Sequence, residues 1–290
     1  MTSERKIFGV FGGGRFHWVG DGFRVHNYFP SGNDLEEKTS PFFLMDYHAP
    51  HAYPPSEKPR GVGVHPHRGF ETVTLAFDGA VAHHDSAGNA GVIRPGDVQW
   101  MTAASGILHK EYHEAEFSRR GGTMHMMQLW VNLPAAHKMS PPRYQELSAA
   151  RMGRVELANG GGVVRVVAGE LSGVKGPAQT FTPIDLWDVT LQPGGRLTTT
   201  FRPHDNTLVL VMSGEVTVNR TLAKTDELVV LDDEGDEVTI EAQGEARVLV
   251  LSGAPLREPV VAYGPFVMNT EQEIREAVAD FNAGKFGALV

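Results

Sequence analysis

The sequence predicts an all-β protein made of two tandem β-barrels with one short C-terminal helix. Turn-forming residues are frequent, with 33 glycines and 18 prolines among 290 residues. Short runs of β-branched and aromatic residues recur between these turns, a pattern typical of sandwiches and barrels. Only one stretch, close to the C-terminus, shows a clear helical repeat of apolar residues. A hydrophobic content of 41% with 21% charged residues excludes a disordered chain.

The strands expected in the first half are defined by their turns. Residues 72–77 are β-branched and aromatic, and Asp78-Gly79 after them is a hairpin signal. Residues 91–93 lead through a second turn at residues 94–97 into an apolar run at 98–101. Residues 124–133 form a long apolar run that stops at Pro134, which predicts a buried strand.

A break in the pattern suggests where the two barrels divide. Residues 134–143 are irregular and contain three prolines, so they are the best candidate for a linker. We therefore expect one barrel in residues 1–135 and another in residues 144–290. The second half returns to short strands, expected at 163–168, 186–191, 207–212, 216–218, 227–231, 238–241 and 247–251.

The C-terminal helix is expected from about residue 271 to residue 281. Thr270 and Glu273 form a capping box, in which each side chain satisfies a backbone N–H of the other. Gly284 suits the position just after the end of the helix. Such a helix should dock on a barrel through one apolar stripe, made of Ile274, Ala277, Val278 and Phe281.

The two halves resemble a diverged repeat. The sequence FDGAV at 77–81 is similar to MSGEV at 212–216, because each ends an apolar strand with a glycine turn and restarts with valine. This register places His65 against Thr200 and His67 against Arg202. The histidine pair is therefore expected only in the first barrel.

Two short motifs indicate a metal site. His65-Pro66-His67 and His109-Lys110-Glu111 each place two ligand-type residues two positions apart, so that in a strand both point to the same side. Two such strands facing each other across a small barrel would bring three imidazoles and one carboxylate together. This set suits a divalent transition metal, by preference iron, and leaves coordination positions open for catalysis. Pro66 fits an edge strand or a bulge.

Other interpretations remain open at this point. With 13 histidines, a chance His-X-His is expected about half the time, so the first pair also fits two surface histidines on a turn. His113 is a rival ligand and Glu71 is a rival carboxylate. Four further histidines are interpreted as two neighbours on opposite strand faces, a core or pocket-lining histidine and a structural histidine: His83 with His84, His125, and His204.

Several function classes are excluded or disfavoured. The chain has no cysteine, which excludes disulfides, thiolate nucleophiles and zinc–thiolate sites. A net charge of −9 without a basic block disfavours direct nucleic-acid binding. There is no GxSxG or GxxxxGK[ST] motif, and the glycines at 12–14 do not fit GxGxxG. Without a signal-like N-terminus or an apolar run of about 18 residues, we expect a cytoplasmic protein with no membrane contact.

The motifs resemble those of a known family. Residues 65–74 (HPHRGFETVT), 83–111, 128–145 and 255–270 are similar, in order, to segments of the pirins, two-domain members of the cupin superfamily. The resemblance implies two tandem cupin barrels of jelly-roll type, with one mononuclear metal in the first and none in the second. The family's ligands fall on His65, His67, His109 and Glu111, whereas Glu71 matches a glutamate that is not a ligand. The chain departs from the family at Ala104, where glycine is common.

The resemblance also implies two possible activities. Some pirins resemble quercetin 2,3-dioxygenase, which opens a flavonol ring with O₂, and others are discussed as regulators that bind a transcription factor or a metabolic enzyme. We expect the dioxygenase, with Fe²⁺ preferred over Cu, Mn, Ni, Co or Zn, and with Glu111 also acting as the base that takes the substrate's hydroxyl proton. A ring-sized apolar lining is expected from Phe43, Met45, Trp100, Met101 and Met126, although each of these also fits core packing.

Overall fold

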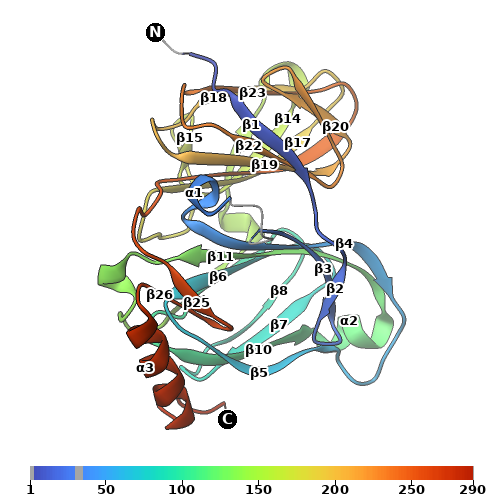
Figure 1. Cartoon of the computed structure of the whole chain (residues 1–290). Coiled ribbons are helices and arrows are strands. Elements are labelled where there is room, and N and C mark those ends of the chain that lie inside the picture. Colours follow the sequence, from blue (N-terminus) through green and yellow to red (C-terminus); the bar gives the residue numbers. More distant parts are fainter. Residues whose placement is uncertain (1–2, 30–34, 290) are drawn as a thin grey trace. The chain divides into compact units, whose positions relative to one another are not determined.

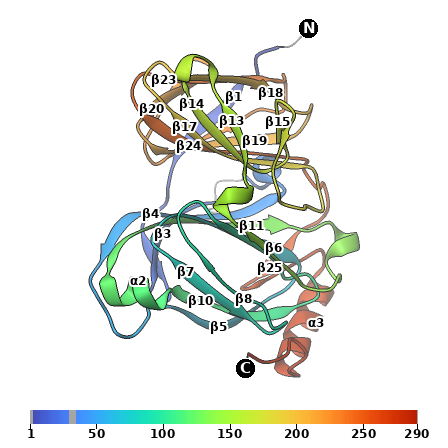
Figure 2. The same cartoon turned by 180° about the vertical axis from the view of Figure 1, so that it is seen from behind.

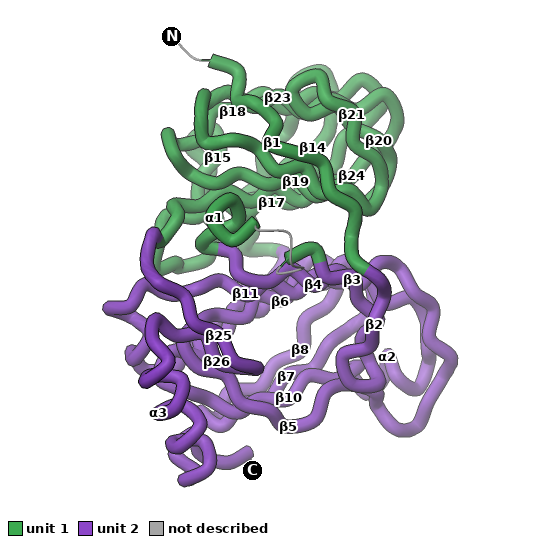
Figure 3. Tube along the Cα trace, in the orientation of Figure 1, with its two compact units in different colours: residues 1–14, 28–41, 150–256 green, residues 15–27, 42–149, 257–290 purple. Residues whose placement is uncertain are grey.

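The computed structural model describes residues 3–29 and 35–289. The chain forms two compact units, each assembled from three segments (Figure 3). We call the unit of residues 15–27, 42–149 and 257–290 the histidine barrel. The unit of residues 1–14, 28–41 and 150–256 is called the C-terminal barrel. Within the described ranges strands are the main element of both units and helices are few and short, which confirms the all-β prediction.

The histidine barrel consists of two main antiparallel sheets (Figure 1). In the larger sheet the strands run in the order β12 (Arg143–Leu147), β9 (Val98–Thr102), β6 (Phe70–Asp78), β11 (Gly122–Asn132), β4 (Phe42–Tyr53), β3 (Phe23–Phe29) and β2 (His17–Val19). In the smaller sheet the order is β5 (Gly61–His67), β10 (Ile107–His113), β7 (Val81–Asp85) and β8 (Ala90–Ile93). The view from behind shows the strands of the smaller sheet side by side in one layer (Figure 2). Helix α2 (Ala115–Arg120) precedes β11.

The C-terminal barrel has the same strand order. Its larger sheet contains β1 (Ile7–Gly12), β22 (Glu227–Leu231), β19 (Asn206–Ser213), β24 (Ala246–Gly253), β17 (Ile184–Leu191), β14 (Gly162–Ala168) and β13 (Gly153–Glu156). Its smaller sheet contains β18 (Arg196–Thr200), β23 (Glu237–Ala242), β20 (Glu215–Val218) and β21 (Thr221–Lys224). This unit also holds the short helix α1 (Glu36–Thr39) and the hairpin of β15 (Glu170–Leu171) and β16 (Val174–Lys175). Since the two orders match strand for strand, the predicted repeat is confirmed.

The register of the repeat differs by one residue from the sequence prediction. The turns at Gly79 and Gly214 do correspond, and both have a positive φ, of 83° and 80°. Strand β5, however, carries a bulge, because two steps along β10 from His109 to Glu111 match three steps along β5. No such shift interrupts the pairing of β18 with β23. Counted along the ladders, the positions that correspond to His65 and His67 are therefore occupied by Thr199 and Phe201, not by Thr200 and Arg202.

The division between the units also differs from a single cut near residue 135. Strand β1 pairs with β22, so the first strand of the chain completes the sheet of the C-terminal barrel. The expected linker at 134–143 is a packed segment: it contains a 3₁₀ turn (Ala135–His137) and the buried Lys138. The Lys138 ammonium donates to the carbonyl oxygens of Gly69 and Val267, at 2.7 and 2.8 Å, and to Asn132 Oδ1. These bonds fix the segment to the histidine barrel.

Helix α3 (Glu271–Asn282) belongs to the histidine barrel rather than to the C-terminal barrel. Its capping box between Thr270 and Glu273 is present, as predicted. Ile274 and Ala277 are buried against the hairpin of β25 (Val261–Tyr263) and β26 (Phe266–Met268), with Phe286 beside them. Phe281, expected in the same stripe, is 39% exposed and only borders this cluster.

Candidate metal centre

Three histidines meet at the edge of the smaller sheet. His65 and His67 lie on the edge strand β5, and His109 lies on its hydrogen-bonded neighbour β10, directly opposite His65. The two strands are therefore adjacent and do not face each other across the barrel. The ring centroids of His65 and His109 are 4.2 Å apart, and His67 lies 4.8 Å from each of them. One nitrogen from each ring lies within 4.8 Å of the others, a spacing that suits a shared metal ion. We call these three residues the outer triad.

The second nitrogen of each ring shows how the triad is oriented. His65 Nδ1 lies 2.8 Å from the Gly63 carbonyl oxygen, and His67 Nδ1 lies 3.4 Å from that of Pro265. Because a carbonyl only accepts, both Nδ1 atoms carry the hydrogen and both Nε2 atoms keep a free lone pair. A backbone carbonyl on the second nitrogen is characteristic of histidines that bind metals. Both nitrogens of His109 are buried and have no hydrogen-bond partner in the described part of the chain. An unsatisfied buried imidazole of this kind fits a metal ligand.

The surroundings of two histidines of the triad favour the neutral imidazole. Burial, reinforced by His65, lowers the pKa of His67 well below its ordinary value. Burial, followed by the neighbouring histidines, lowers the pKa of His109 in the same way. Neutral imidazoles are the form that binds divalent transition metals, so His67 and His109 are ready to bind without first losing protons. His65 is partly exposed, which leaves the cluster reachable from the surface.

The carboxylate of Glu111 is held apart from His65 and His67. Its Oε1 accepts from Gln99 Nε2 at 2.6 Å and from Thr74 Oγ1 at 3.2 Å, and its Oε2 accepts from Gln128 Nε2 at 2.7 Å. Glu111 pairs with Val62 on β5 and with His83 on β7. The ligand atoms of Glu111, His83 and His109 lie within 4.8 Å of one another, and we call these residues the inner triad. The four predicted residues thus fall into two groups that share His109.

Sequence reasoning missed His83 as a member of this centre. The side chain is fully buried and stacks on Tyr144, with 4.9 Å between ring centroids. His84, on the opposite face as predicted, stacks on Tyr112 instead. The sequence does contain a signal, because Asp85 lies two residues after His83 and so shares its face of the strand.

The other candidate ligands lie outside both triads. His113 Nε2 donates to the Gly22 carbonyl at 2.8 Å, and its ring packs against Tyr53. His125 is a satisfied core histidine, as predicted, with Nε2 2.8 Å from the Tyr47 hydroxyl. His204 adopts a positive φ of 65° in a loop of the C-terminal barrel. Ala104, the departure from the family, has a φ of 40°, in the region that favours glycine.

Glu71 lies on the face of β6 that points away from Thr74 and therefore away from the metal centre. Its Oε1 accepts from Thr102 Oγ1 at 2.6 Å. Burial raises the pKa of Glu71 from 4.5 to about 7. Between these values the folded state binds more protons than the unfolded state, so this carboxyl lowers stability as the pH rises through that window.

We expect Glu71→Gln to stabilise the protein at high pH and to leave metal binding unchanged. The amide keeps an acceptor for Thr102 but cannot ionise, so the gain should approach about 3 kcal/mol near pH 8 and shrink toward zero near pH 4.5. Urea unfolding at the two pH values, with metal analysis of the same samples, measures both effects. An equal shift at both pH values would contradict the assigned titration.

The predicted apolar lining is only partly correct. Met45 and Trp100 are fully buried on the outward face of the larger sheet, because they alternate with residues that face the barrel interior. The wall beside the outer triad is aromatic instead. Trp130 stacks on Phe70 at 4.2 Å, borders Phe43 at 6.4 Å, and lies 5.2 Å from His67, all measured between ring centroids. Trp130 lies within the apolar run 124–133, and the sequence pattern of that run did not indicate that its side chain lines the candidate site.

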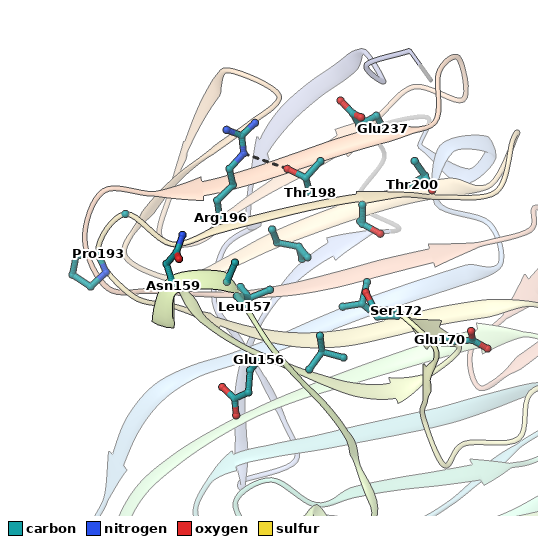
Figure 4. Close-up of a pocket in the computed structure, with 17 residues that line it drawn as sticks. Glu156, Leu157, Asn159, Glu170, Ser172, Pro193, Arg196, Thr198, Thr200 and Glu237 are labelled. Atoms are coloured by element: carbon teal, nitrogen blue, oxygen red, sulfur yellow. Dashed lines mark hydrogen bonds between the residues drawn. The ribbon is translucent and has the colours of Figure 1, made fainter. Parts of the chain in front are cut away.

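The C-terminal barrel carries a groove of about 900 Å³ (Figure 4). Its lining is mixed: Arg196 donates to Thr198 Oγ1 at 3.2 Å, and Leu157 and Glu237 lie on the wall. None of its lining residues is a histidine. The positions that correspond to the two triads are occupied by Thr199, Phe201, Val218, Val238 and Ile240. Four of these five are apolar, which makes a poor ligand set.

None of the helices in the described ranges is both long enough and apolar enough to cross a membrane.

Comparisons with known proteins agree with the fold. The pirin family model matches residues 22–131, and the model of the pirin C-terminal cupin domain matches residues 186–287. A Pseudomonas aeruginosa protein named "Putative quercetin 2,3-dioxygenase PA2418" is 48% identical over 282 residues, which cover 97% of this chain and 98% of that protein. Human pirin is 39% identical over 79% of each chain.

A solved structure shows the same likeness. The crystal structure of quercetin 2,3-dioxygenase from Acinetobacter baumannii superposes with a TM-score of 0.95 at 46% identity, covering 99% of this chain and 100% of that one. Both barrels are therefore cupin domains, and the histidine–carboxylate cluster of the first suggests a divalent metal. The chain belongs to the pirin family.

Proposed function

We propose that this protein is a metal-dependent dioxygenase that opens a flavonol, or a similar enolic aromatic, with O₂. The observation that carries the proposal is the outer triad, with three imidazoles around one point and a partly exposed edge. Relatives named as quercetin 2,3-dioxygenases supply the substrate class. The proposed ligands are His65, His67, His109 and Glu111, and the proposed metal is Fe²⁺.

The metal and the protein would divide the chemistry between them. A bound divalent transition metal supplies Lewis acidity and one-electron redox chemistry toward O₂. Trp130, which stacks on the buried Phe70 and borders Phe43, offers a flat surface on which an aromatic substrate can stack beside His67. The wall would orient the substrate hydroxyl toward the cluster.

Glu111 is the proposed base for the substrate hydroxyl. Its Oε1 already accepts two hydrogen bonds, from Gln99 and Thr74, whereas Oε2 accepts one from Gln128. Oε2 therefore has more lone-pair capacity left and is the atom we assign to receive the proton. The two glutamine amides keep the carboxylate in place while it does so.

Turnover of quercetin tests the proposal directly. Protein loaded with iron under anaerobic conditions should consume O₂ and release carbon monoxide when quercetin and air are supplied. His65→Ala, which removes one ligand of the outer triad, is the control. Uptake no greater than that of the control, across several loaded metals, would overturn the dioxygenase and favour a regulator that uses the same metal.

Glu111→Gln separates the role of base from that of ligand. If Oε2 takes the proton, we expect kcat to fall by at least about 100-fold, since general-base catalysis contributes factors of roughly 10² to 10⁴. Much of the metal should remain, because the three histidines of the outer triad are intact. Unchanged kcat with full metal occupancy would exclude Glu111 as the base.

A further inference from the structure

We propose that His83 is a metal-binding residue, and that the inner triad of His83, His109 and Glu111 forms a second position for the ion, overlapping the outer one. This inference rests on the proposed metal-dependent function. One ion would then have two arrangements available, with His109 common to both.

The first argument is the state of the His83 ring. The side chain is completely buried, and its Nδ1 has no hydrogen-bond partner among the described residues. The ring lies 5.4 Å from that of His109, centroid to centroid. One ligand atom each of His83, His109 and Glu111 lies within 4.8 Å of the other two. A buried imidazole nitrogen without a partner is expensive to leave unsatisfied, and a cation bound among His83, His109 and Glu111 would satisfy all three groups.

The second argument is the carboxylate behind His83. His83 Nε2 lies 3.3 Å from Asp85 Oδ2. Asp85 is itself fixed as an acceptor, because its Oδ1 accepts from the backbone N–H groups of Ala87 and Asn89, both at 2.9 Å. Nε2 of His83 therefore carries the hydrogen, and Nδ1 keeps its lone pair for the interior. A carboxylate behind the second ring nitrogen is the usual partner of a metal-binding histidine.

The third argument is the position of His109 between the two groups. Strand β10 lies between β5 and β7, so His109 faces His65 across one ladder and Asp85 across the other. It is the one residue present in both triads, and both of its ring nitrogens lack a hydrogen-bond partner within the described ranges. The other histidines of the two triads each have one nitrogen near an acceptor. His109 alone is left unsatisfied on both sides, as expected for a residue that serves both positions.

The test uses Co²⁺, whose visible absorption reports the number and type of its ligands. The full-length protein is stripped, then titrated with Co²⁺ as wild type, His83→Ala, His65→Ala, His109→Ala and the His65→Ala/His83→Ala double variant. His84→Ala is the matched control, because His84 is adjacent in the strand but stacks on Tyr112 on the opposite face. His83→Gln, which keeps a donor for Asp85, replaces the alanine variant if that one does not fold.

If the inner position exists, His83→Ala raises the Co²⁺ Kd at least about tenfold and alters the absorption spectrum, since even residues behind a ligand change affinity by about 10- to 100-fold. His65→Ala still binds one ion, more weakly, whereas His109→Ala and the double variant bind none. His84→Ala behaves as wild type. A His83→Ala protein with wild-type Kd and spectrum, or a His65→Ala protein as empty as His109→Ala, overturns the inner position and leaves the metal protein standing. A wild-type protein that binds no Co²⁺ overturns the proposed function itself.

Discussion

His109→Ala should remove metal from the whole chain. His109 is the residue that both triads share, so its loss leaves two histidines at the outer position and one histidine with one carboxylate at the inner one. Replacing a residue that only hydrogen-bonds to a metal ligand already weakens metal affinity by about 10- to 100-fold. Loss of the shared ligand itself should therefore raise the metal Kd by more than about 100-fold. Metal analysis after iron or nickel loading measures the effect.

We expect the C-terminal barrel to bind no metal ion of its own. Any metal that remains in His109→Ala could therefore not be attributed to that barrel. Where the histidine barrel has His109 and Glu111, it has Val238 and Ile240, which pack in its apolar core. Its role is then structural, or it offers a surface to a partner. One equivalent of tightly bound transition metal in His109→Ala would contradict both the ligand assignment and the metal-free second barrel. Circular dichroism of the variant, compared with His84→Ala, separates loss of ligand from loss of fold.

Local patterns in the sequence predicted the elements of the fold well. The Thr270–Glu273 capping box and the hairpin turn at Gly79 depend on neighbours within a few residues, and both are present. The same reasoning could not place β1, because its pairing with β22 joins residues more than 200 positions apart. Nor could it assign the C-terminal helix to the histidine barrel, since an apolar stripe predicts burial without identifying the partner surface.

The residues of the candidate metal centre were predicted by type but not by arrangement. Same-face spacing grouped His109 with Glu111, and the structure does place both in the barrel interior. Which partners each one meets depends on the strand order β5–β10–β7 and on the bulge in β5, neither of which is readable from spacing. The bulge offsets Glu111 from the histidines of β5, and β7 brings His83 beside it. A site shared by three strands thus looked like a site shared by two.

Helix α3 connects the stability of the histidine barrel to the geometry of its metal centre. Arg68, next to His67, is buried, and its guanidinium donates to Asp280 of the helix at 2.9 Å and to the Ser105 carbonyl at 2.7 Å. The helix also covers β26, and Pro265 just before β26 supplies the carbonyl that orients His67. The C-terminal segment therefore supports the candidate ligand His67 in two ways. The Pro265 carbonyl contacts its ring directly, and the Arg68–Asp280 ion pair holds the chain just after β5.

Truncation after Thr270 should destabilise the histidine barrel by several kcal/mol and weaken metal binding. The apolar contacts of Ile274, Ala277 and Phe286 are lost, at roughly 1.5–3 kcal/mol for each large side chain, and Arg68 is left without its carboxylate. The milder variant Ile274→Ala should also be destabilising. Its free energy of unfolding, measured with urea, should fall by about 2 kcal/mol or more. Arg275→Ala is the control, since Arg275 is exposed and bonds only within the helix, and it should stay within about 0.5 kcal/mol of wild type. If truncation left both the unfolding midpoint and the metal Kd at their wild-type values, the helix would have no part in holding His67, and the orientation of that side chain would have to come from β5 and the Pro265 carbonyl without it.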